Sequence, residues 1–221
     1  MRKWWAVLLD WVFPPRCPVC RLAVDSHGLL CPQCLAGISR AHEINVVIRR
    51  LVALDGCQVL CDYAGGVKFL ISGMKFCQKA YYAVHLRRLL MERLDVMRLP
   101  DVDVVVPVPL HITRLKERGF NQTTLVFEKW AKHYGILWSG DMLARVKATA
   151  PQWTLVAKER RKNVKDAFVL TRPDWAKGKR ILLVDDIITT GFTMNECAKT
   201  LKKGGAIAVF GLALAGGGDG C

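Results

Sequence analysis

The second half of the chain alternates short apolar runs with stretches whose apolar residues recur at helical spacing. Nearly continuous apolar runs, which are typical of strands buried on both faces, lie at 101–109, around 136–146, at 181–184 and at 206–214. Because strands and helices alternate, we expect an α/β fold with an open parallel sheet flanked by helices. Ligands of such a sheet bind beyond the carboxyl ends of its strands.

Helices are predicted between these runs. Phe127, Trp130, Ala131 and Tyr134 share one helical face before Gly135, and Met194, Cys197, Ala198 and Leu201 share another before Gly204 and Gly205. An amphipathic helix is also predicted at 79–98, and GCQVLCDY at 56–63 favours a strand in the otherwise mixed segment 45–78. The stretch 147–168 is basic with little pattern, and the tail at 216–221 is expected to be disordered.

The first 17 residues join basic and apolar positions and superficially resemble a signal peptide. Asp10 interrupts the apolar run and no small-residue cleavage site follows, which favours a short amphipathic helix. The apolar run at 206–215 is far shorter than the roughly 20 residues that a spanning helix needs. We therefore expect a soluble protein that is not transmembrane.

Four of the nine cysteines form two C-x₂-C pairs, CPVC at 17–20 and CPQC at 31–34. Two tight turns that each present two thiols match a tetrahedral Zn²⁺. The predicted ligands are Cys17, Cys20, Cys31 and Cys34, and since they fill all four positions the zinc is expected to be structural. His27 is expected in the intervening loop rather than on the metal. The remaining cysteines within the fold, Cys57, Cys61, Cys77 and Cys197, are expected to be buried apolar side chains.

The chain is strongly basic, with 33 Lys and Arg against 19 Asp and Glu and a formal net charge of +14. Such an excess predicts a polyanionic partner, either nucleic acid or a phosphorylated ligand. The net charge alone does not distinguish a nucleic acid from a phosphorylated ligand.

The segment ILLVDDIITTGFT at 181–193 is interpreted as a strand at 181–184, a loop at 185–193 and a helix from 193. Backbone N–H groups of the loop at a helix N-terminus would form an anion cradle, and Gly191 lets that backbone approach a ligand closely. Asp185 and Asp186 would repel a phosphate unless they face hydroxyl groups or a hydrated Mg²⁺. A sugar phosphate meets both demands.

The chain has neither a P-loop nor the G-x-G-x-x-G of dinucleotide-binding folds. VDDIITTGFT instead resembles the phosphoribosyl-pyrophosphate (PRPP) motif of type I phosphoribosyltransferases. By that resemblance, Asp185 and Asp186 are the catalytic acids that hold the ribose hydroxyls. The same resemblance assigns the 5′-phosphate to Ile188, Thr189, Thr190, Gly191, Phe192 and Thr193. An alternative is that the two acids only cap a helix and the threonines only solvate a loop. That alternative would not explain why the acids and threonines occur together with Gly191 after a buried strand.

The pyrophosphate loop of such enzymes belongs at VPVP, residues 106–109, where basic residues follow closely. Its candidate residues are Pro107, Val108, Pro109, Arg114 and Arg118. The stretch 147–168 occupies the place of the family's mobile loop and offers Lys147, Arg160 and Arg161, although a solvated basic face is the commoner fate of such a run. Cations here, with Mg²⁺ bound to PRPP, would stabilise the departing pyrophosphate.

A zinc knuckle before this domain resembles the ComF family of competence proteins. FPPRCPVC at 13–20, PVPLHITRLKERGFNQ at 107–122, KATAPQ at 147–152 and ERRKNVKDAF at 159–168 extend the likeness over nearly the whole chain. It implies a helix and zinc knuckle at 1–44 and a type I phosphoribosyltransferase-like domain at 45–221. Within that domain we expect a hood and helix at 45–100, called the hood below, a core at 101–215 and the tail at 216–221. Many relatives carry a second pair of metal-binding turns, of which only Cys57 and Cys61 remain here, and this argues against a second zinc.

The resemblance also implies a cytoplasmic bacterial protein that handles incoming single-stranded DNA during natural transformation. Competence proteins, including a helicase-like partner, would work beside it and could hold it at the inner face of the membrane. Two functions stay open: a phosphoribosyltransferase with an unidentified acceptor, and a non-catalytic protein that senses PRPP and binds DNA, with Trp153 as a stacking candidate. A nucleobase salvage transferase is a further alternative, which the knuckle and the charge disfavour. Lys68 and Lys75 of the hood could point toward an acceptor but are expected at the surface.

Overall fold

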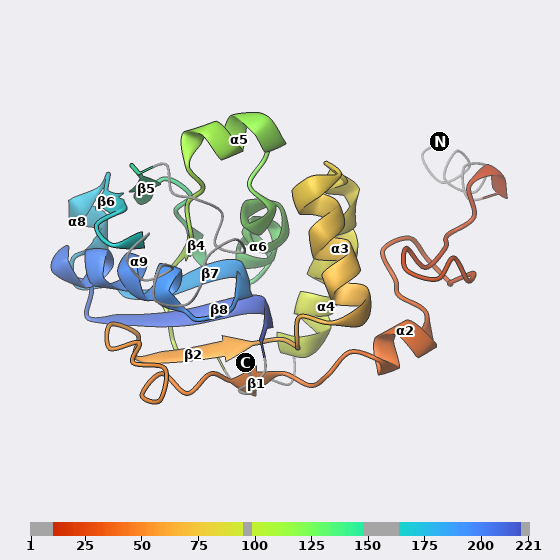
Figure 1. The fold of residues 1–221 in the computed structure, drawn as a ribbon, viewed down its shortest axis with the longest axis horizontal. Coiled ribbons are helices and arrows are strands. Elements are labelled where there is room, and N and C mark those ends of the chain that lie inside the picture. The colour runs from red at the N-terminus through yellow and green to blue at the C-terminus, as the bar shows by residue number, and fades with distance from the viewer. Residues whose placement is uncertain (1–10, 95–98, 148–163, 218–221) are drawn as a thin grey trace.

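A six-stranded sheet forms the centre of the computed structural model, which describes residues 11–94, 99–147 and 164–217 (Figure 1). The strand order is β1-β2-β8-β7-β3-β4, and all neighbours run parallel except β1 and β2. The strands are β1 (His42–Glu43), β2 (Gly56–Val59), β3 (Val104–Pro107), β4 (Leu137–Trp138), β7 (Arg180–Ile188) and β8 (Ala208–Gly216). This mostly parallel sheet confirms the predicted α/β fold class.

Helices cover both faces of the sheet (Figure 1). One face carries α3 (Gly65–Phe76), α4 (Ala83–Leu94) and α6 (Gln122–His133). The other carries α9 (Phe192–Lys203), the short α8 (Pro173–Ala176) and a two-stranded sheet of β5 (Leu143–Arg145) and β6 (Phe168–Leu170). Ile181 and Leu183 of β7 enter one core cluster, and Leu182 and Val184 enter the other. This burial on both faces explains why the run 181–184 is wholly apolar.

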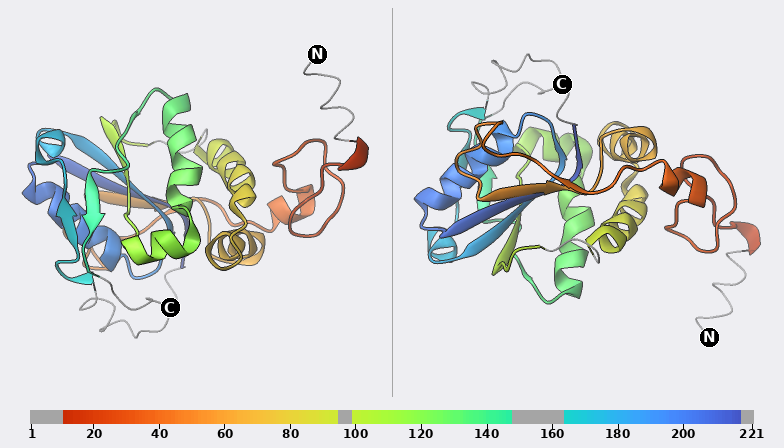
Figure 2. Two further views of the ribbon diagram at one scale, coloured as in Figure 1. Left: turned by 90° about the horizontal axis from the view of Figure 1, so that it is seen from above. Right: turned by 90° about the horizontal axis from the view of Figure 1, so that it is seen from below.

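The cysteine-rich module lies at one end of the molecule, beside α3 and α4, in all three views (Figures 1 and 2). It contains one short helix, α2 (Pro32–Ala36). Leu30 and Leu35 pack against the core cluster beneath α3 and α4. The module is therefore attached to the hood rather than to the centre of the sheet.

Two predicted strands differ in the structure. The strand expected around 136–146 is two strands, because the chain turns at Gly140 and Asp141 after β4 and then runs as β5, which pairs antiparallel with β6. The strand expected at 181–184 continues to Ile188, so Asp185 and Asp186 belong to β7 and not to a loop. The weakly patterned stretch before residue 77 contains the buried helix α3.

The predicted helical faces are largely confirmed. Met194, Cys197, Ala198 and Leu201 of α9 are all buried, as are Phe127, Trp130 and Ala131 of α6, whereas Tyr134 follows the end of α6 and is half exposed. The helix expected at 79–98 begins with a 3₁₀ turn, η1 (Ala80–Tyr82), and continues as α4, and its last predicted residues lie outside the described part of the chain. Most of the amphipathic helix expected at the N-terminus, and most of the tail at 216–221, also lie outside the described residues.

Candidate functional site

A polar cavity of about 160 Å³ lies where β3 and β7 end. Its wall combines two acids from β7 with four cations from three other elements. The lining residues are Lys75, Phe76, Val108, Pro109, Leu110, Arg114, Arg118, Gln122, Arg145, Asp185, Asp186, Ile187 and Thr193. The structure thus brings seven of the predicted site residues to one cavity: Val108, Pro109, Arg114, Arg118, Asp185, Asp186 and Thr193.

The two acids occupy the last part of β7 and face different partners. Asp186 is buried, and its carboxylate accepts one hydrogen bond from Lys75 Nζ at 2.8 Å and another from Gln122 Nε2. Gln122 Oε1 in turn accepts a hydrogen bond from Arg118. Asp185 Oδ1 accepts from the Asp186 backbone N–H at 2.8 Å. The strand continues through both acids because side chains of α3 and α6 satisfy the buried Asp186.

Burial, and after it the neighbouring charge of Asp186, raise the pKa of Asp185 to about 7, although Lys75 and Arg145 act in the opposite direction. A carboxyl group with a pKa near neutrality is unusual and is typical of functional sites. Its negative charge is costly in the unliganded cavity, so a ligand that donates hydrogen bonds there would be bound strongly.

The cations come from helix α5 (Ile112–Arg118) and from β5. His111 caps the start of α5, and Gly119, with φ of 79°, ends it. Burial lowers the pKa of Arg118 and of Arg145, as expected for guanidinium groups removed from water. Arg145 was not singled out from the sequence, since it stands alone in an apolar strand and only the turn before β5 directs it to the cavity.

Lys75 was expected at the surface, and the structure contradicts this. Its side chain is 19% exposed and its ammonium group pairs with Asp186, because α3 crosses the end of β7. Gln122 was also missed, since it opens α6 and no pattern marks it as a site residue. By contrast, Lys68 is exposed, and its ammonium group lies 5.9 Å from the centre of the Tyr63 ring.

The loop after β7 leads directly into the N-terminus of α9. Ile188 is the buried last residue of the strand, Gly191 caps the helix with φ of 79°, and Phe192 is its first residue. Among the described residues, the hydroxyl of Thr190 is buried and has no hydrogen-bond partner. A phosphate at this helix N-terminus would supply an acceptor.

A loop of the hood, residues 45–55, contacts this turn from the outside. Arg49 donates hydrogen bonds to the carbonyl oxygen of Thr189 and, at 3.1 Å, to that of Gly217. Asn195 Oδ1 accepts from the Ala53 backbone N–H at 3.0 Å. The hood loop and the turn are therefore one interlocked unit.

We expect Gly191→Ala to destabilise the protein by about 1–3 kcal/mol more than Gly119→Ala. Both glycines have φ of 79°, so both substitutions carry the same left-handed backbone cost. Only at residue 191 would the new Cβ lie 2.5 Å from Leu51 Cδ1, while nothing lies within 4 Å at residue 119. Urea unfolding of both variants measures the difference. Equal losses of unfolding free energy in the two variants would mean that the Leu51 side chain can shift without an energetic penalty.

The remaining candidates lie away from the cavity or outside the described residues. Pro107 is the last residue of β3, and Lys147 is exposed and donates to the carbonyl oxygen of Lys165 at 3.1 Å. Arg160, Arg161 and Trp153 fall in the undescribed stretch 148–163.

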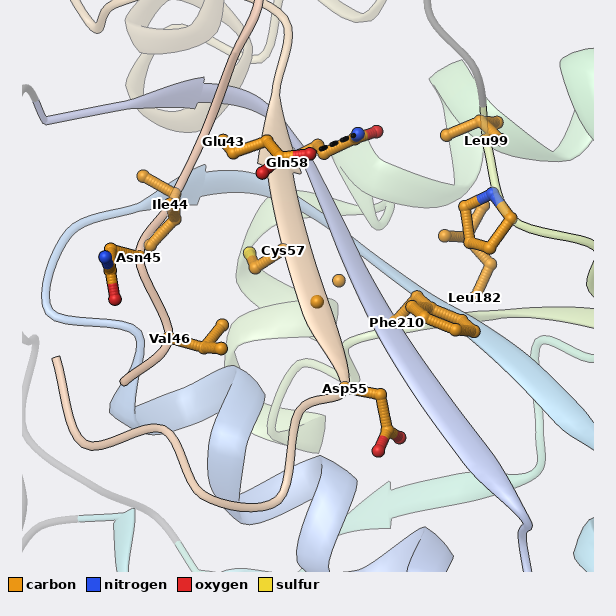
Figure 3. Close-up of a pocket in the computed structure, with 13 residues that line it drawn as sticks. Glu43, Ile44, Asn45, Val46, Asp55, Cys57, Gln58, Leu99, Leu182 and Phe210 are labelled. Atoms are coloured by element: carbon orange, nitrogen blue, oxygen red, sulfur yellow. Dashed lines mark hydrogen bonds between the residues drawn. The ribbon is translucent and has the colours of Figure 1, made fainter. Parts of the chain in front are cut away.

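A larger cavity, of about 820 Å³, lies between β1 and the sheet face near Leu99 and Pro100 (Figure 3). Phe210 and Leu182 form its apolar floor, and Glu43 and Asp55 are its charged residues. Its described lining contains no Lys, Arg or His. An anionic ligand therefore fits the smaller cavity by charge, despite the difference in volume.

The four N-terminal cysteines converge. The sulfur atoms of Cys17, Cys20, Cys31 and Cys34 all lie within 4.8 Å of one another. Tetrahedral Zn²⁺ with Zn–S bonds of about 2.3 Å separates its sulfurs by roughly 3.8 Å, so the cluster fits this ion. Burial opposes ionisation of Cys17, but backbone hydrogen bonds from Cys31, Cys20 and Val19 outweigh it and lower its pKa to about 6. A thiolate is the form that binds metal.

The other cysteines form no second cluster among the described residues. Burial raises the pKa of Cys57 and of Cys61 to about 12, and the two thiols belong to different core clusters. Cys197 is buried as expected, but Cys77 is exposed, because it follows the last turn of α3 rather than facing the core. His27 is exposed and is not a member of the four-thiol group. In the described part of the chain, no helix is both long and apolar enough to cross a membrane.

Two family models match this chain. A double zinc ribbon domain matches residues 8–44, and a phosphoribosyl transferase domain matches residues 135–215. The four-cysteine cluster lies within the first match and is a structural zinc site of ribbon type. Among solved structures, glutamine PRPP amidotransferase of Bacillus subtilis is similar with a TM-score of 0.38 and 20% identity, over 59% of this chain and 26% of its own.

Curated relatives match over most of their length. DNA utilization protein YhgH of Salmonella typhi is 36% identical over 200 residues, which are 87% of this chain and 86% of the relative. Competence protein F of Haemophilus influenzae is 32% identical over 210 residues, which are 91% of this chain and 85% of the relative. With a zinc ribbon before a phosphoribosyltransferase domain, this chain belongs to the ComF family of competence proteins.

Proposed function

We propose that this protein binds PRPP, as its Mg²⁺ complex, in the cavity at the ends of β3 and β7. The observation that carries the proposal is the meeting of two carboxylates and three arginines around one cavity. A ligand that satisfies both groups offers hydroxyls to the acids and phosphates to the cations. PRPP offers both, and the ComF family context supports it.

The turn at 188–193 would hold the 5′-phosphate. The first N–H groups of α9 have no partner within the helix, and the helix dipole favours an anion there. The buried, unpartnered hydroxyl of Thr190 adds a donor, and Gly191 allows close approach of the backbone.

The cations of α5 and β5 would hold the pyrophosphate. Arg114, Arg118 and Arg145 line the wall of the cavity that Val108 and Pro109 continue. If the bond between the ribose and the pyrophosphate oxygen breaks, negative charge grows on pyrophosphate, and these guanidinium groups would stabilise it. Mg²⁺ bound with PRPP would supply further positive charge at the same oxygens. The ribose would pass to an acceptor whose identity is open, so binding without transfer is the alternative.

Calorimetric titration of PRPP into the zinc-loaded protein, with and without Mg²⁺, tests this function. Saturable, Mg²⁺-dependent binding is expected, with ribose 5-phosphate and pyrophosphate each binding more weakly because each reaches only half of the site. Absence of saturable binding would contradict the proposal. Release of pyrophosphate on adding a free nucleobase would identify a salvage transferase instead.

We further propose that the protein binds single-stranded DNA, as the names of its relatives, DNA utilization protein and competence protein, suggest. One groove favours this role. It measures about 520 Å³, lies between the zinc module and α4, and is lined by Phe13, Tyr81, Arg16, Arg21 and His85 together with other residues. Phe13 is 66% exposed and Tyr81 61%. Exposed rings among cations are typical of surfaces that stack bases and contact phosphates. With the proposed domain boundaries of 1–44 and 45–221, the DNA-contacting surface would comprise the N-terminal module and part of the hood. The PRPP site would lie within the second domain.

We expect Tyr81→Ala to weaken binding of an oligo(dT) strand by about 10-fold, the loss of one stacked base. Fluorescence anisotropy at several salt concentrations measures it, since phosphate contacts also predict weaker binding as salt rises. Trp175→Ala, which removes a partly exposed ring from α8 on the other side of the sheet, is the matched control. Equal effects of both substitutions would exclude this groove as the binding surface.

A further inference from the structure

The ion pair between Lys75 and Asp186 crosses from the hood to the sheet. The two charged atoms are 2.8 Å apart, and their side chains are only 19% and 5% exposed. A pair so removed from water is strongly coupled, and loss of either partner leaves an uncompensated buried charge. It therefore holds the last turn of α3 against the end of β7.

In that last turn, Gly73 and Met74 are buried. Leu70, Ile71 and Met74 anchor the body of α3 in the core, but Phe76 is 62% exposed and Cys77 is exposed. Just beyond the helix, Gln78 Nε2 donates to the carbonyl oxygen of Glu117 at 3.3 Å on the exposed surface. Beyond Met74, Lys75 supplies the charged attachment of this end of the hood helix to β7.

The same ion pair occupies an atom that a sugar ligand needs. Asp186 Oδ1 accepts from Lys75 and Oδ2 from Gln122, so both oxygens are engaged by the protein itself. The cavity that they line measures about 160 Å³. Pockets for small ligands usually measure about 300–1,000 Å³. A phosphorylated sugar therefore requires the cavity to widen, and a sugar hydroxyl that approaches Asp186 competes with Lys75 for Oδ1.

We propose that Lys75 is a latch that closes the site in the ligand-free protein. Its ammonium group holds α3 over the cavity and takes the place of a ligand hydroxyl on Asp186. Binding of the sugar phosphate breaks the pair, and the end of α3 moves outward. The cost of breaking the pair then lowers the affinity for the ligand. This inference rests on the proposed PRPP site, but the latch itself has a ligand-independent consequence.

Three variants of α3 test the latch. Lys75→Met keeps the length of the side chain without its charge, Lys75→Arg keeps the charge, and Lys68→Met removes an exposed charge from the same helix. In the ligand-free protein we expect amide hydrogen exchange of residues 73–76 to rise at least about 10-fold in Lys75→Met only. Unchanged exchange would overturn the latch, whether or not PRPP binds.

Titration of Mg-PRPP supplies the second readout. Lys75→Met should bind about 10-fold more tightly than wild type, while Lys75→Arg and Lys68→Met should resemble wild type. A lysine with a merely structural role would not raise affinity when removed, so unchanged or weaker binding by Lys75→Met overturns the latch. If neither the wild-type protein nor any variant binds PRPP, the proposed function fails. Hydrogen exchange alone then decides whether Lys75 closes the cavity.

Discussion

Asp185→Asn is expected to weaken Mg-PRPP binding by about 100-fold without loss of stability at neutral pH. The carboxylate of Asp185 would accept two ribose hydroxyls, and each charge-assisted hydrogen bond contributes about 1.5 kcal/mol or more. An amide keeps the shape of the side chain but accepts more weakly. The protein should tolerate the change, because burial makes the ionised carboxylate itself unfavourable.

Calorimetry with Mg-PRPP measures the affinity, and Asp174→Asn, at an exposed position of α8, is the matched control. The control should bind like wild type. Equal affinity of Asp185→Asn and wild type would refute the assignment of Asp185 to the ligand. Asp186→Asn is a poorer test, because it also leaves Lys75 buried without its partner.

The same variant has a signature in the pH dependence of stability. The folded-state pKa of Asp185 is about 7, against an ordinary value of 3.8. Between these values the folded state holds a proton that the unfolded state has lost, so this group makes stability fall as pH rises from about 4 to about 7. Asp185→Asn lacks this fall. We therefore expect it to gain stability over wild type progressively across that window, by up to a few kcal/mol above pH 7, in urea unfolding at each pH.

Zinc removal is expected to unfold the N-terminal module completely while the sheet stays folded. The module has one short helix and few buried apolar residues, so the metal supplies most of its folding free energy. Zinc bound by four thiolates contributes on the order of 10 kcal/mol in small ribbons and fingers. Either a chelator or Cys17→Ser should have this effect, since Cys17 is a buried ligand of the cluster.

Limited proteolysis with mass spectrometry gives the readout. Cleavage between residues 17 and 34 should become rapid, while fragments that contain β7 and β8 persist. Cys77→Ser is the control, because that thiol is exposed and is not a member of the cluster. An unchanged cleavage pattern after measured zinc loss would contradict a structural role for the metal.

The elements that the sequence predicts well are those with a strong local period or spacing. The buried face of α9 follows from apolar residues at intervals of three and four, and it is buried as expected. The cysteine cluster follows from two C-x₂-C turns, because each turn brings its own two thiols together. Strand β7 was predicted too short, since acids inside a strand violate the apolar pattern unless partners from elsewhere satisfy them.

The sequence by itself determined the α/β order, the four zinc ligands, the acidic strand end and the glycine turn before α9, because each is a local pattern of neighbouring residues. Only the tertiary structure decided what surrounds the acids. Lys75, Gln122 and Arg145 precede Asp186 by 111, 64 and 41 positions in the sequence. In the folded protein, Lys75 and Gln122 nevertheless donate hydrogen bonds to Asp186, and Arg145 lines the same cavity. Such contacts depend on how α3, α6 and β5 pack across the sheet. No local periodicity encodes that arrangement, so the partly closed cavity and the raised pKa of Asp185 emerge only when the chain is folded.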